Sequence, residues 1–182
     1  MLYLTFLILN ALEMLVEVGI SAKNSAQLAK QGAIEIGPKL LPVMAAFYGL
    51  MYAGSFLEYS YFPKTLSVVW ATSFLSVYIL AKVLKFWAVW ALGASWTMKV
   101  LIIPGSRVAI GGPYRWIKHP NYVAVMMELA ATPLLGKSYV TFAVAFTGFL
   151  VVLYYRIRLE EEALTQHTDY SQRMASKRRF FP

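Results

Sequence analysis

The chain has 182 residues, of which 59% belong to the apolar set AVILMFWYC and only 14% are charged. A soluble domain has about 45–50% apolar and about 25% charged residues, and a fold this small leaves much of its surface in water. The composition therefore excludes a soluble globular domain, a disordered chain and a fibrous repeat, and it indicates an integral membrane protein. The chain contains no Cys, which excludes disulfides, thiolate nucleophiles and Cys-ligated metal sites.

The charge is strongly basic, with 17 Lys and Arg against 9 Asp and Glu and a formal net charge of +8. In a soluble protein this balance would suggest a nucleic-acid partner. No nucleic-acid-binding motif accompanies it, and basic loops beside an anionic leaflet explain the excess in a membrane protein. We expect no nucleic-acid partner.

Five apolar stretches are candidates for membrane spans, which need about 20 residues each. They cover residues 1–20, 40–62, 65–81 with a continuation toward 92, 123–135, and 139–155. The fourth has only 13 residues and needs flanking residues such as Asn121 and Tyr122 to extend it. The first has no Lys or Arg before its apolar part and no clear cleavage site, which favours a span over a signal peptide.

The sequence thus predicts an all-α membrane bundle of about five transmembrane helices. We interpret residues 1–182 as one domain, with an N-terminal two-helix part at 1–62 and the remaining core at 65–182. With five spans, 15 of the 17 Lys and Arg residues fall on one side of the membrane, in 21–39, 82–122 and the tail from Arg156. The positive-inside rule places that side in the cytoplasm and the N-terminus outside.

Four carboxylates fall within the expected spans. Glu13 and Glu17 share one helix face, Glu58 lies near an outer end, and Glu128 lies within the short fourth stretch. Such carboxylates are costly in a membrane; they either pair with Lys or Tyr in the bundle or mark a functional site. We favour pairing for Glu13 and Glu17 and leave both interpretations open for Glu128.

A dense group of donors and rings precedes the fourth stretch. Residues 111–122 read Gly-Gly-Pro-Tyr-Arg-Trp-Ile-Lys-His-Pro-Asn-Tyr. The prolines break helices and the glycines permit unusual backbone angles, so the pattern predicts a bent, rigid loop at the membrane surface. Such a loop suits a ligand with an aromatic base and a carboxylate. The alternative is an interfacial belt of Trp, Tyr and Arg anchors.

The tail carries a second group. Residues 156–164 read Arg-Ile-Arg-Leu-Glu-Glu-Glu-Ala-Leu, in which Arg156 and Glu160 are four residues apart, as are Arg158 and Glu162. A solvated helix with ion pairs would have this pattern. Three adjacent carboxylates on the positively charged side of a membrane also suit a cationic ligand.

In combination, the loop motif at 112–122 and the Arg-x-x-x-Glu-Glu motif at 156–161 resemble the isoprenylcysteine carboxyl methyltransferase family. The resemblance covers roughly residues 75–182, including Leu92-Gly93-x-x-Trp96. It implies a small helical membrane bundle that binds S-adenosylmethionine between the loop and the tail, without a Rossmann domain. The absence of a Gly-x-Gly-x-x-Gly motif after a strand agrees with this.

The resemblance also implies the site residues. The cofactor would contact Tyr114, His119, Pro120, Asn121, Tyr122, Glu160 and Glu161, with Val108 and Ala109 contributing through their backbone. Arg156 would orient the methyl acceptor, and Glu128 or His119 would serve as base for an acceptor that must lose a proton. Methyl transfer from a sulfonium needs no metal, and we expect none.

The sequence departs from the family pattern at several positions. Lys118 stands where an Arg is frequent, which keeps the charge but loses planar, bidentate binding. Residues 106–109, Ser-Arg-Val-Ala, replace a His-x-Leu-Val stretch. Thr168-Asp169-Tyr170 lacks the usual preceding Gly, and Met174 falls near a second expected Tyr.

The sequence leaves the identity of the methyl acceptor open. An isoprenylcysteine carboxylate and a small lipid hydroxyl or phenol are both compatible with the motifs, and the alternatives are a phospholipid N-methyltransferase and a non-enzymatic transporter or assembly protein. The short chain resembles bacterial members, which favours a bacterial inner membrane. The expected partners are therefore the bilayer and a lipophilic or prenylated acceptor; the oligomeric state cannot be predicted.

Overall fold

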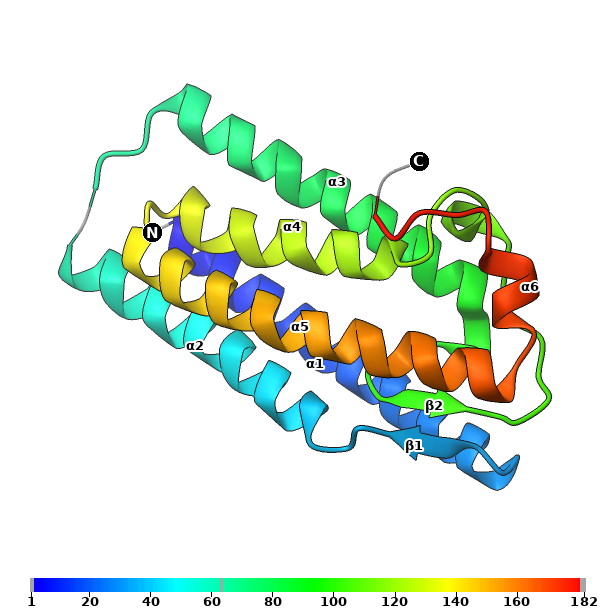
Figure 1. The fold of residues 1–182 in the computed structure, drawn as a ribbon. Coiled ribbons are helices and arrows are strands. Elements are labelled where there is room, and N and C mark those ends of the chain that lie inside the picture. Colours follow the sequence, from blue (N-terminus) through cyan, green and yellow to red (C-terminus); the bar gives the residue numbers. More distant parts are fainter. Residues whose placement is uncertain (1, 63, 181–182) are drawn as a thin grey trace.

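A computed structural model, which describes residues 2–62 and 64–180, consists of long helices that run side by side in alternating directions (Figure 1). The elements in chain order are α1 (Leu2–Lys30), β1 (Ile34–Ile36), α2 (Leu40–Tyr61), α3 (Val68–Leu92), η1 (Gly93–Ser95), β2 (Val100–Ile102), η2 (Gly112–Arg115), α4 (Pro120–Leu135), α5 (Tyr139–His167) and α6 (Tyr170–Met174). Both strands, η2 and α6 lie at one end of the bundle, at the right in Figure 1. The segments that the sequence assigns to the cytoplasm are therefore gathered at that end.

Local sequence signals set several helix boundaries. The hydroxyl of Ser67 caps α3 by accepting a hydrogen bond from the Trp70 amide at 3.2 Å. Helix α3 ends at Gly93, whose φ of 54° lies in the region that favours glycine. Pro120 starts α4, where its missing N–H costs no helical hydrogen bond.

Four of the described helices, α1, α2, α3 and α5, are long and apolar enough to cross a membrane. Helix α4 has 16 residues, about 24 Å, and is shorter than the hydrocarbon core. Ten of its residues are buried, because it packs between α3 and α5. The all-α membrane bundle is confirmed, and α4 is a fifth, shorter helix that packs between longer ones.

Three helices extend beyond the fully apolar stretches of the sequence. Helix α1 continues to Lys30 and α5 to His167, and α3 reaches Leu92, as its expected continuation indicates. The charge count assigned Lys82 and Lys85 to a cytoplasmic loop, but both lie inside α3 and face the bundle. The number of Lys and Arg residues on the expected cytoplasmic side therefore falls from 15 to 13. Their placement in a span is possible because carboxylates of α1 and α4 pair with them.

Two strands of three residues each interrupt the helical pattern. Strand β1 pairs antiparallel with β2, with Glu35 opposite Leu101. The segment from 34 to 36 alternates Ile-Glu-Ile, which suits a half-buried strand, but its length is too short for a sequence signal. The pair joins the connection after α1 to the connection after α3 and forms one wall at the site end of the bundle.

Small residues bring the helices close together. A Cβ atom on Gly148 of α5 would lie 2.2 Å from the Phe47 ring of α2, and one on Gly54 of α2 would lie 2.9 Å from the Thr141 side chain. At the end opposite the strands, Glu58 of α2 accepts hydrogen bonds from the Thr141 amide and hydroxyl, both at 2.9 Å, and so caps the start of α5.

Candidate functional site

A cavity of about 830 Å³ opens among the helices at the end of the bundle that carries the strands. Its walls come from α1, α2, α3, α4 and α5, from β2 and the loop after it, and from η2 and α6. One part is polar, where the loop before α4 meets the second half of α5. The other part extends among apolar side chains of α1, α2, α4 and α5, including Val18, Met44, Val125 and Phe149.

The loop between β2 and α4 is held by the C-terminal region of the chain. The Gly105 amide donates to the His167 carbonyl and the Val108 amide donates to the Asp169 carboxylate, both at 2.8 Å. Gly112 has a φ of 55°, and a Cβ there would lie 2.8 Å from that of Ala91, so the glycine permits the loop to pack on α3.

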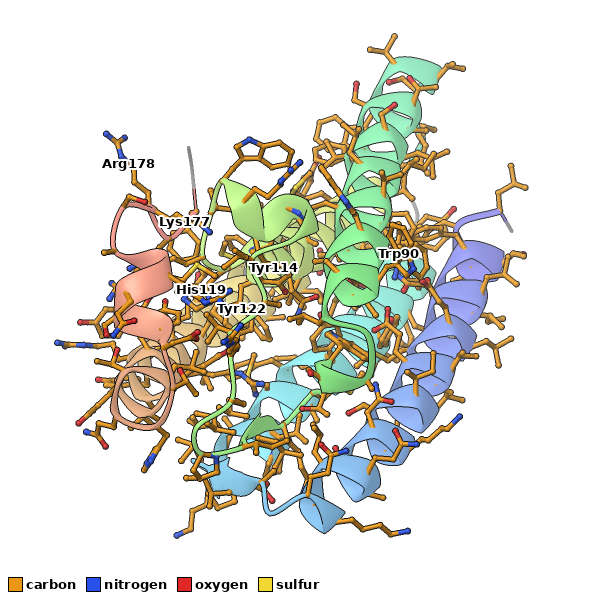
Figure 2. All side chains as sticks on the ribbon, turned by 90° about the vertical axis from the view of Figure 1, so that its right-hand side faces the viewer. Trp90, Tyr114, His119, Tyr122, Lys177 and Arg178 are labelled. Atoms are coloured by element: carbon orange, nitrogen blue, oxygen red, sulfur yellow. The ribbon has the colours of Figure 1, made fainter. Side chains whose placement is uncertain are left out.

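The final described residues, 177–180, form a strap across this loop. The Lys118 amide donates to the Arg178 carbonyl at 2.9 Å, and the His119 amide donates to the Arg179 carbonyl at 3.1 Å. The Lys177 ammonium donates to the Tyr114 carbonyl at 2.7 Å. Figure 2 places Lys177 and Arg178 beside the loop that carries Tyr114 and His119.

The hydroxyl of Tyr122 joins the two sequence motifs. It accepts a hydrogen bond from Arg156 Nε at 2.9 Å and donates one to the Glu160 carboxylate. Arg156 is buried, and its Nη2 donates to the Met98 carbonyl at 2.6 Å. The guanidinium therefore connects α5 to α4 and to the segment before β2, with one face toward the cavity.

Glu161 faces a different set of partners from Glu160. One of its oxygens lies 2.9 Å from His119 Nε2, and it accepts two hydrogen bonds from Arg179 at 3.0 and 2.7 Å through different oxygens. The His119 ring stacks on Tyr122 with centroids 5.2 Å apart (Figure 2). Glu161 thus holds both His119 and the strap in position.

Several polar atoms on the cavity wall point to a ligand. Asn121 Oδ1 and Trp96 Nε1 are buried without a hydrogen-bond partner among the described residues. Burial, followed by the charge of Glu160, raises the pKa of Tyr114 above its ordinary value, so its hydroxyl remains a neutral donor. Buried polar atoms without partners are rare, and a bound molecule is one way to satisfy them.

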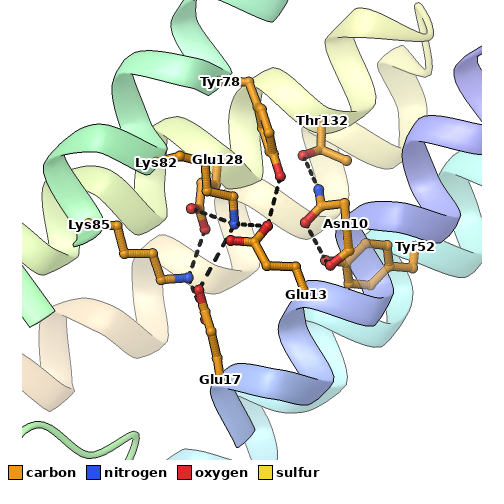
Figure 3. Close-up of polar contacts among 9 residues, drawn as sticks. All are labelled: Asn10, Glu13, Glu17, Tyr52, Tyr78, Lys82, Lys85, Glu128 and Thr132. Carbon is orange, nitrogen blue, oxygen red and sulfur yellow. Dashed lines mark hydrogen bonds and ion pairs between the residues drawn. The ribbon is translucent and has the colours of Figure 1, made fainter. Parts of the chain in front are cut away.

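A second polar cluster lies deeper in the bundle (Figure 3). Lys82 Nζ lies 2.8 Å from Glu13 and 2.9 Å from Glu128, and Lys85 Nζ lies 2.6 Å from Glu17 and 3.0 Å from Glu128. The pairing expected for Glu13 and Glu17 is therefore present. Charges in such a site are stable only when they are paired, because their desolvation costs several kcal/mol per ion.

The structure brings most of the predicted site residues to one cavity. Its wall includes seven of the nine expected cofactor contacts and the expected catalytic Arg156: Val108, Ala109, Tyr114, His119, Asn121, Tyr122, Glu160 and Arg156. Pro120 starts α4 behind the wall, and Glu161 faces the strap. Glu128 pairs with Lys82 and Lys85 and is not itself among the residues of the wall. Its role as a base therefore stays a prediction that the geometry does not favour.

Sequence reasoning missed other residues of the wall. One of them is Trp96, which lines the cavity. It belongs to the Leu-Gly-x-x-Trp stretch of the family resemblance, and that stretch is the sequence signal that could have identified it. Glu17 and Lys85 also line the cavity. The sequence singles out Glu17 as an intramembrane carboxylate, but no local pattern places either residue on this wall, because their position depends on how α1 and α3 pack against α4.

Comparisons with known proteins give one family match and two relatives. The model of the isoprenylcysteine carboxyl methyltransferase (ICMT) family matches residues 74–166. The uncharacterized protein YpbQ of Bacillus subtilis (strain 168) is 34% identical over 152 residues, which cover 84% of this chain and 90% of that protein. An uncharacterized protein of Haemophilus influenzae (strain ATCC 51907 / DSM 11121 / KW20 / Rd) is 25% identical over 150 residues, covering 81% and 86%.

No solved structure matches this chain. The matched segment begins within α3 and ends one residue before the last residue of α5, so it contains the loop, α4 and both motifs that meet at Tyr122. This match and the YpbQ relative together place the chain in a family of membrane methyltransferases: it belongs to the isoprenylcysteine carboxyl methyltransferase family.

Proposed function

We propose that this membrane methyltransferase transfers a methyl group from S-adenosylmethionine to a lipophilic acceptor in the cavity. The observation that carries the proposal is the continuity of the cavity wall, which runs from Glu160 and Arg156 to Met44 and Phe149. The first pair suits a charged cofactor and a reacting group, and the second suits an apolar chain. A cofactor from the cytosol and an acceptor from the bilayer would meet between them.

The residues at the polar end fit S-adenosylmethionine. Its sulfonium and α-ammonium groups are cationic and suit the Glu160 carboxylate, and its carboxylate suits the Lys118 ammonium on the same wall. The buried Asn121 Oδ1 and Trp96 Nε1 supply an acceptor and a donor that have no partner among the described residues. The rings of Tyr114 and Tyr122 supply surfaces for the adenine.

When bound, the cofactor supplies an activated methyl group, so the protein has to align the reactants and exclude water. Tyr122 holds Glu160 and Arg156 in fixed orientations by bonding to both. Arg156 can then orient the polar group of the acceptor by a charge-assisted hydrogen bond. The loop and strap cover the polar end, which removes water from the reacting groups.

The acceptor would enter laterally, between helices, from the bilayer. A carboxylate, as in a prenylated cysteine, and a lipid hydroxyl or phenol both suit a cavity with a cation at one end and apolar walls at the other. In this proposal the strap end of the bundle faces the cytoplasm and the N-terminus lies outside, in the orientation that the basic loops favour, within a bacterial inner membrane.

The proposal is tested by cofactor binding and turnover of purified protein. Glu160→Gln removes the negative charge at the polar end of the cavity, so the affinity for S-adenosylhomocysteine and S-adenosylmethionine should fall at least tenfold. The matched control is Glu162→Gln, because Glu162 contacts only the exposed Gln166 among the described residues and lies off this cavity. Turnover is measured with radiolabelled cofactor on lipid extract and on a synthetic prenylcysteine.

Two results would contradict the proposal. One is the absence of saturable binding of either cofactor form below millimolar concentration. The other is equal loss of affinity in the Glu160 and Glu162 variants, which would mean that the binding does not use this cavity.

A further inference from the structure

The polar cluster within the membrane-spanning helices reaches the cavity at one place. Glu13, Glu17, Glu128, Lys82 and Lys85 come from α1, α4 and α3, and of these only Glu17 and Lys85 are among the described residues of the cavity wall (Figure 3). Both side chains are more than nine-tenths buried, with 7% and 3% of their surface exposed. A buried, charged pair therefore forms part of the wall against which an acceptor would lie.

The three carboxylates of the cluster differ in how they are engaged. Each oxygen of Glu128 lies within 3.0 Å of a lysine ammonium. Glu13 uses Oε2 for both of its contacts, with Lys82 at 2.8 Å and with the donating Tyr78 hydroxyl at 3.2 Å; its Oε1 is buried without a partner among the described residues, but Glu13 lies off the cavity wall. Glu17 has Oε2 2.6 Å from Lys85, whereas its Oε1 lies 4.0 Å from Lys82, beyond hydrogen-bond distance.

The position of the cluster along the bundle also suits an acceptor. Along α4, Glu128 lies six residues, or about 9 Å, beyond Tyr122, with Val125 between them. The wall thus passes from the Arg156–Tyr122–Glu160 group, past Val125, to the Lys85–Glu17 pair that Glu128 supports. An acceptor held beside Arg156 would share the cavity wall with this pair.

We propose that Glu17 is the catalytic base for an acidic lipid hydroxyl, a phenol or an enol, and that Lys85 holds the carboxylate toward the cavity. This inference rests on the proposed methyltransferase function. The acceptor oxygen attacks the methyl carbon with its electron pair, the carbon–sulfur bond breaks with its electrons on sulfur, and the hydroxyl proton passes to Glu17 Oε1. The products are a methyl ether, a neutral thioether and a protonated carboxyl.

Charge balance favours this acceptor over a carboxylate. Methylation of a carboxylate releases no proton, whereas methylation of a neutral hydroxyl releases one. Three carboxylates and two ammonium groups give the ionised cluster one excess negative charge, which a single proton neutralises. A carboxylate is a weak base, so the hydroxyl must be acidic; a phenol, with a pKa of about 10, is within reach.

The test compares two acceptors in Glu17→Gln. A long-chain alkylphenol must lose a proton during transfer, whereas its dinitro-substituted analogue, a nitrophenolate, is already ionised at neutral pH. Loss of a general base should lower kcat/KM for the alkylphenol by about 100-fold or more and leave the nitrophenolate within a few-fold of the unaltered protein. Affinity for S-adenosylhomocysteine should stay unchanged; the thermal midpoint should fall, because Lys85 loses one of its two carboxylate partners, but the variant should remain folded at the assay temperature.

Glu13→Gln is the matched control. It removes the same charge from the same cluster and the same helix, one turn away from Glu17 and off the cavity wall. Both acceptors should retain kcat/KM within about tenfold in this variant. If Glu17→Gln unfolds, Glu17→Asp keeps the charge beside Lys85 but withdraws the oxygen, and it should lose at least tenfold on the alkylphenol alone.

The inference is overturned if the Glu17 variant loses activity equally on both acceptors, if Glu13→Gln matches it on the alkylphenol, or if the unaltered protein methylates a prenylcysteine carboxylate but neither phenol. Each of these results leaves the methyltransferase proposal intact. Failure of that proposal is recognised separately, because the unaltered protein would then bind no S-adenosylhomocysteine at all.

Discussion

Tyr122 is the residue on which the geometry of the polar end depends. Its hydroxyl takes a hydrogen bond from Arg156 and gives one to Glu160, and its ring stacks on His119. Both motifs therefore meet at one phenolic oxygen. Removing that oxygen leaves a buried guanidinium N–H and a carboxylate oxygen with one partner fewer.

Tyr122→Phe should therefore destabilise the fold by about 1–3 kcal/mol, the cost of leaving buried polar groups unsatisfied. The affinity for S-adenosylhomocysteine should also fall about tenfold, because Glu160 loses its fixed orientation. Thermal unfolding in detergent, with and without S-adenosylhomocysteine, measures both effects. Tyr154→Phe serves as control, since that exposed hydroxyl bonds only to the neighbouring Arg158; equal effects of the two substitutions would contradict the role given to Tyr122.

For single residues, the sequence predicts which of them come together, but it does not predict which partner each one contacts. The motif residues His119, Asn121, Tyr122, Arg156 and Glu160 do share a cavity wall. Glu160 and Glu161 are adjacent in sequence, yet successive helical residues point about 100° apart, so one faces the cavity and the other holds the strap. Such a difference depends on the rotation of α5 against α4, which no motif encodes.

Among the elements, the close contact between α2 and α5 depends on a glycine of α5. Gly148 leaves room for the Phe47 ring, which a Cβ would approach to 2.2 Å. Small residues at such positions let membrane helices pack closely. This contact supports the half of α5 that precedes Arg156.

Gly148→Ala should destabilise the protein by about 1–3 kcal/mol, the usual cost of overpacking a close contact. Gly49→Ala is the control, because nothing lies within 4 Å of the added Cβ and alanine favours the helix by about 1 kcal/mol. The thermal midpoints of the two variants in the same detergent provide the comparison. A midpoint for Gly148→Ala at or above that of the unaltered protein would show that Phe47 moves aside freely.

The elements also show where periodicity fails as a guide. The sequence predicts the order of the helices and a continuation of the third toward Leu92, but the charge count assigns Lys82 and Lys85 to a cytoplasmic loop, because lysines normally mark the end of a span. Lys82 and Lys85 continue α3 instead, since Glu13, Glu17 and Glu128 receive them. The two short strands were not predicted either, because three residues carry too little pattern.

For the molecule as a whole, the polar features lie at one end and inside the bundle. The cavity, the strap and most basic residues gather at the end where α1, α3 and α5 finish, and the opposite end has two short connections (Figure 1). Five alternating helices leave the N-terminus and the strap at opposite ends. The basic residues then determine which end faces the cytoplasm.

This sidedness can be measured because the chain has no Cys of its own. Ser176→Cys, at the strap end, should react with a membrane-impermeant maleimide in inside-out vesicles and not in intact cells. Thr65→Cys, at the opposite end, should give the reverse pattern; both positions are exposed. Labelling of both from the same side would contradict the five-helix topology.

The ion pairs of the inner cluster have a consequence for how the chain is inserted during synthesis. Glu13 and Glu17 enter the bilayer more than 60 residues before Lys82 and Lys85 emerge from the ribosome, and Glu128 follows later still. Until then α1 carries unpaired carboxylates in hydrocarbon, at a cost of a few kcal/mol each. Pairing with the lysines removes this cost, so we expect the membrane insertion of α1 to be stabilised when α3 and α4 join it.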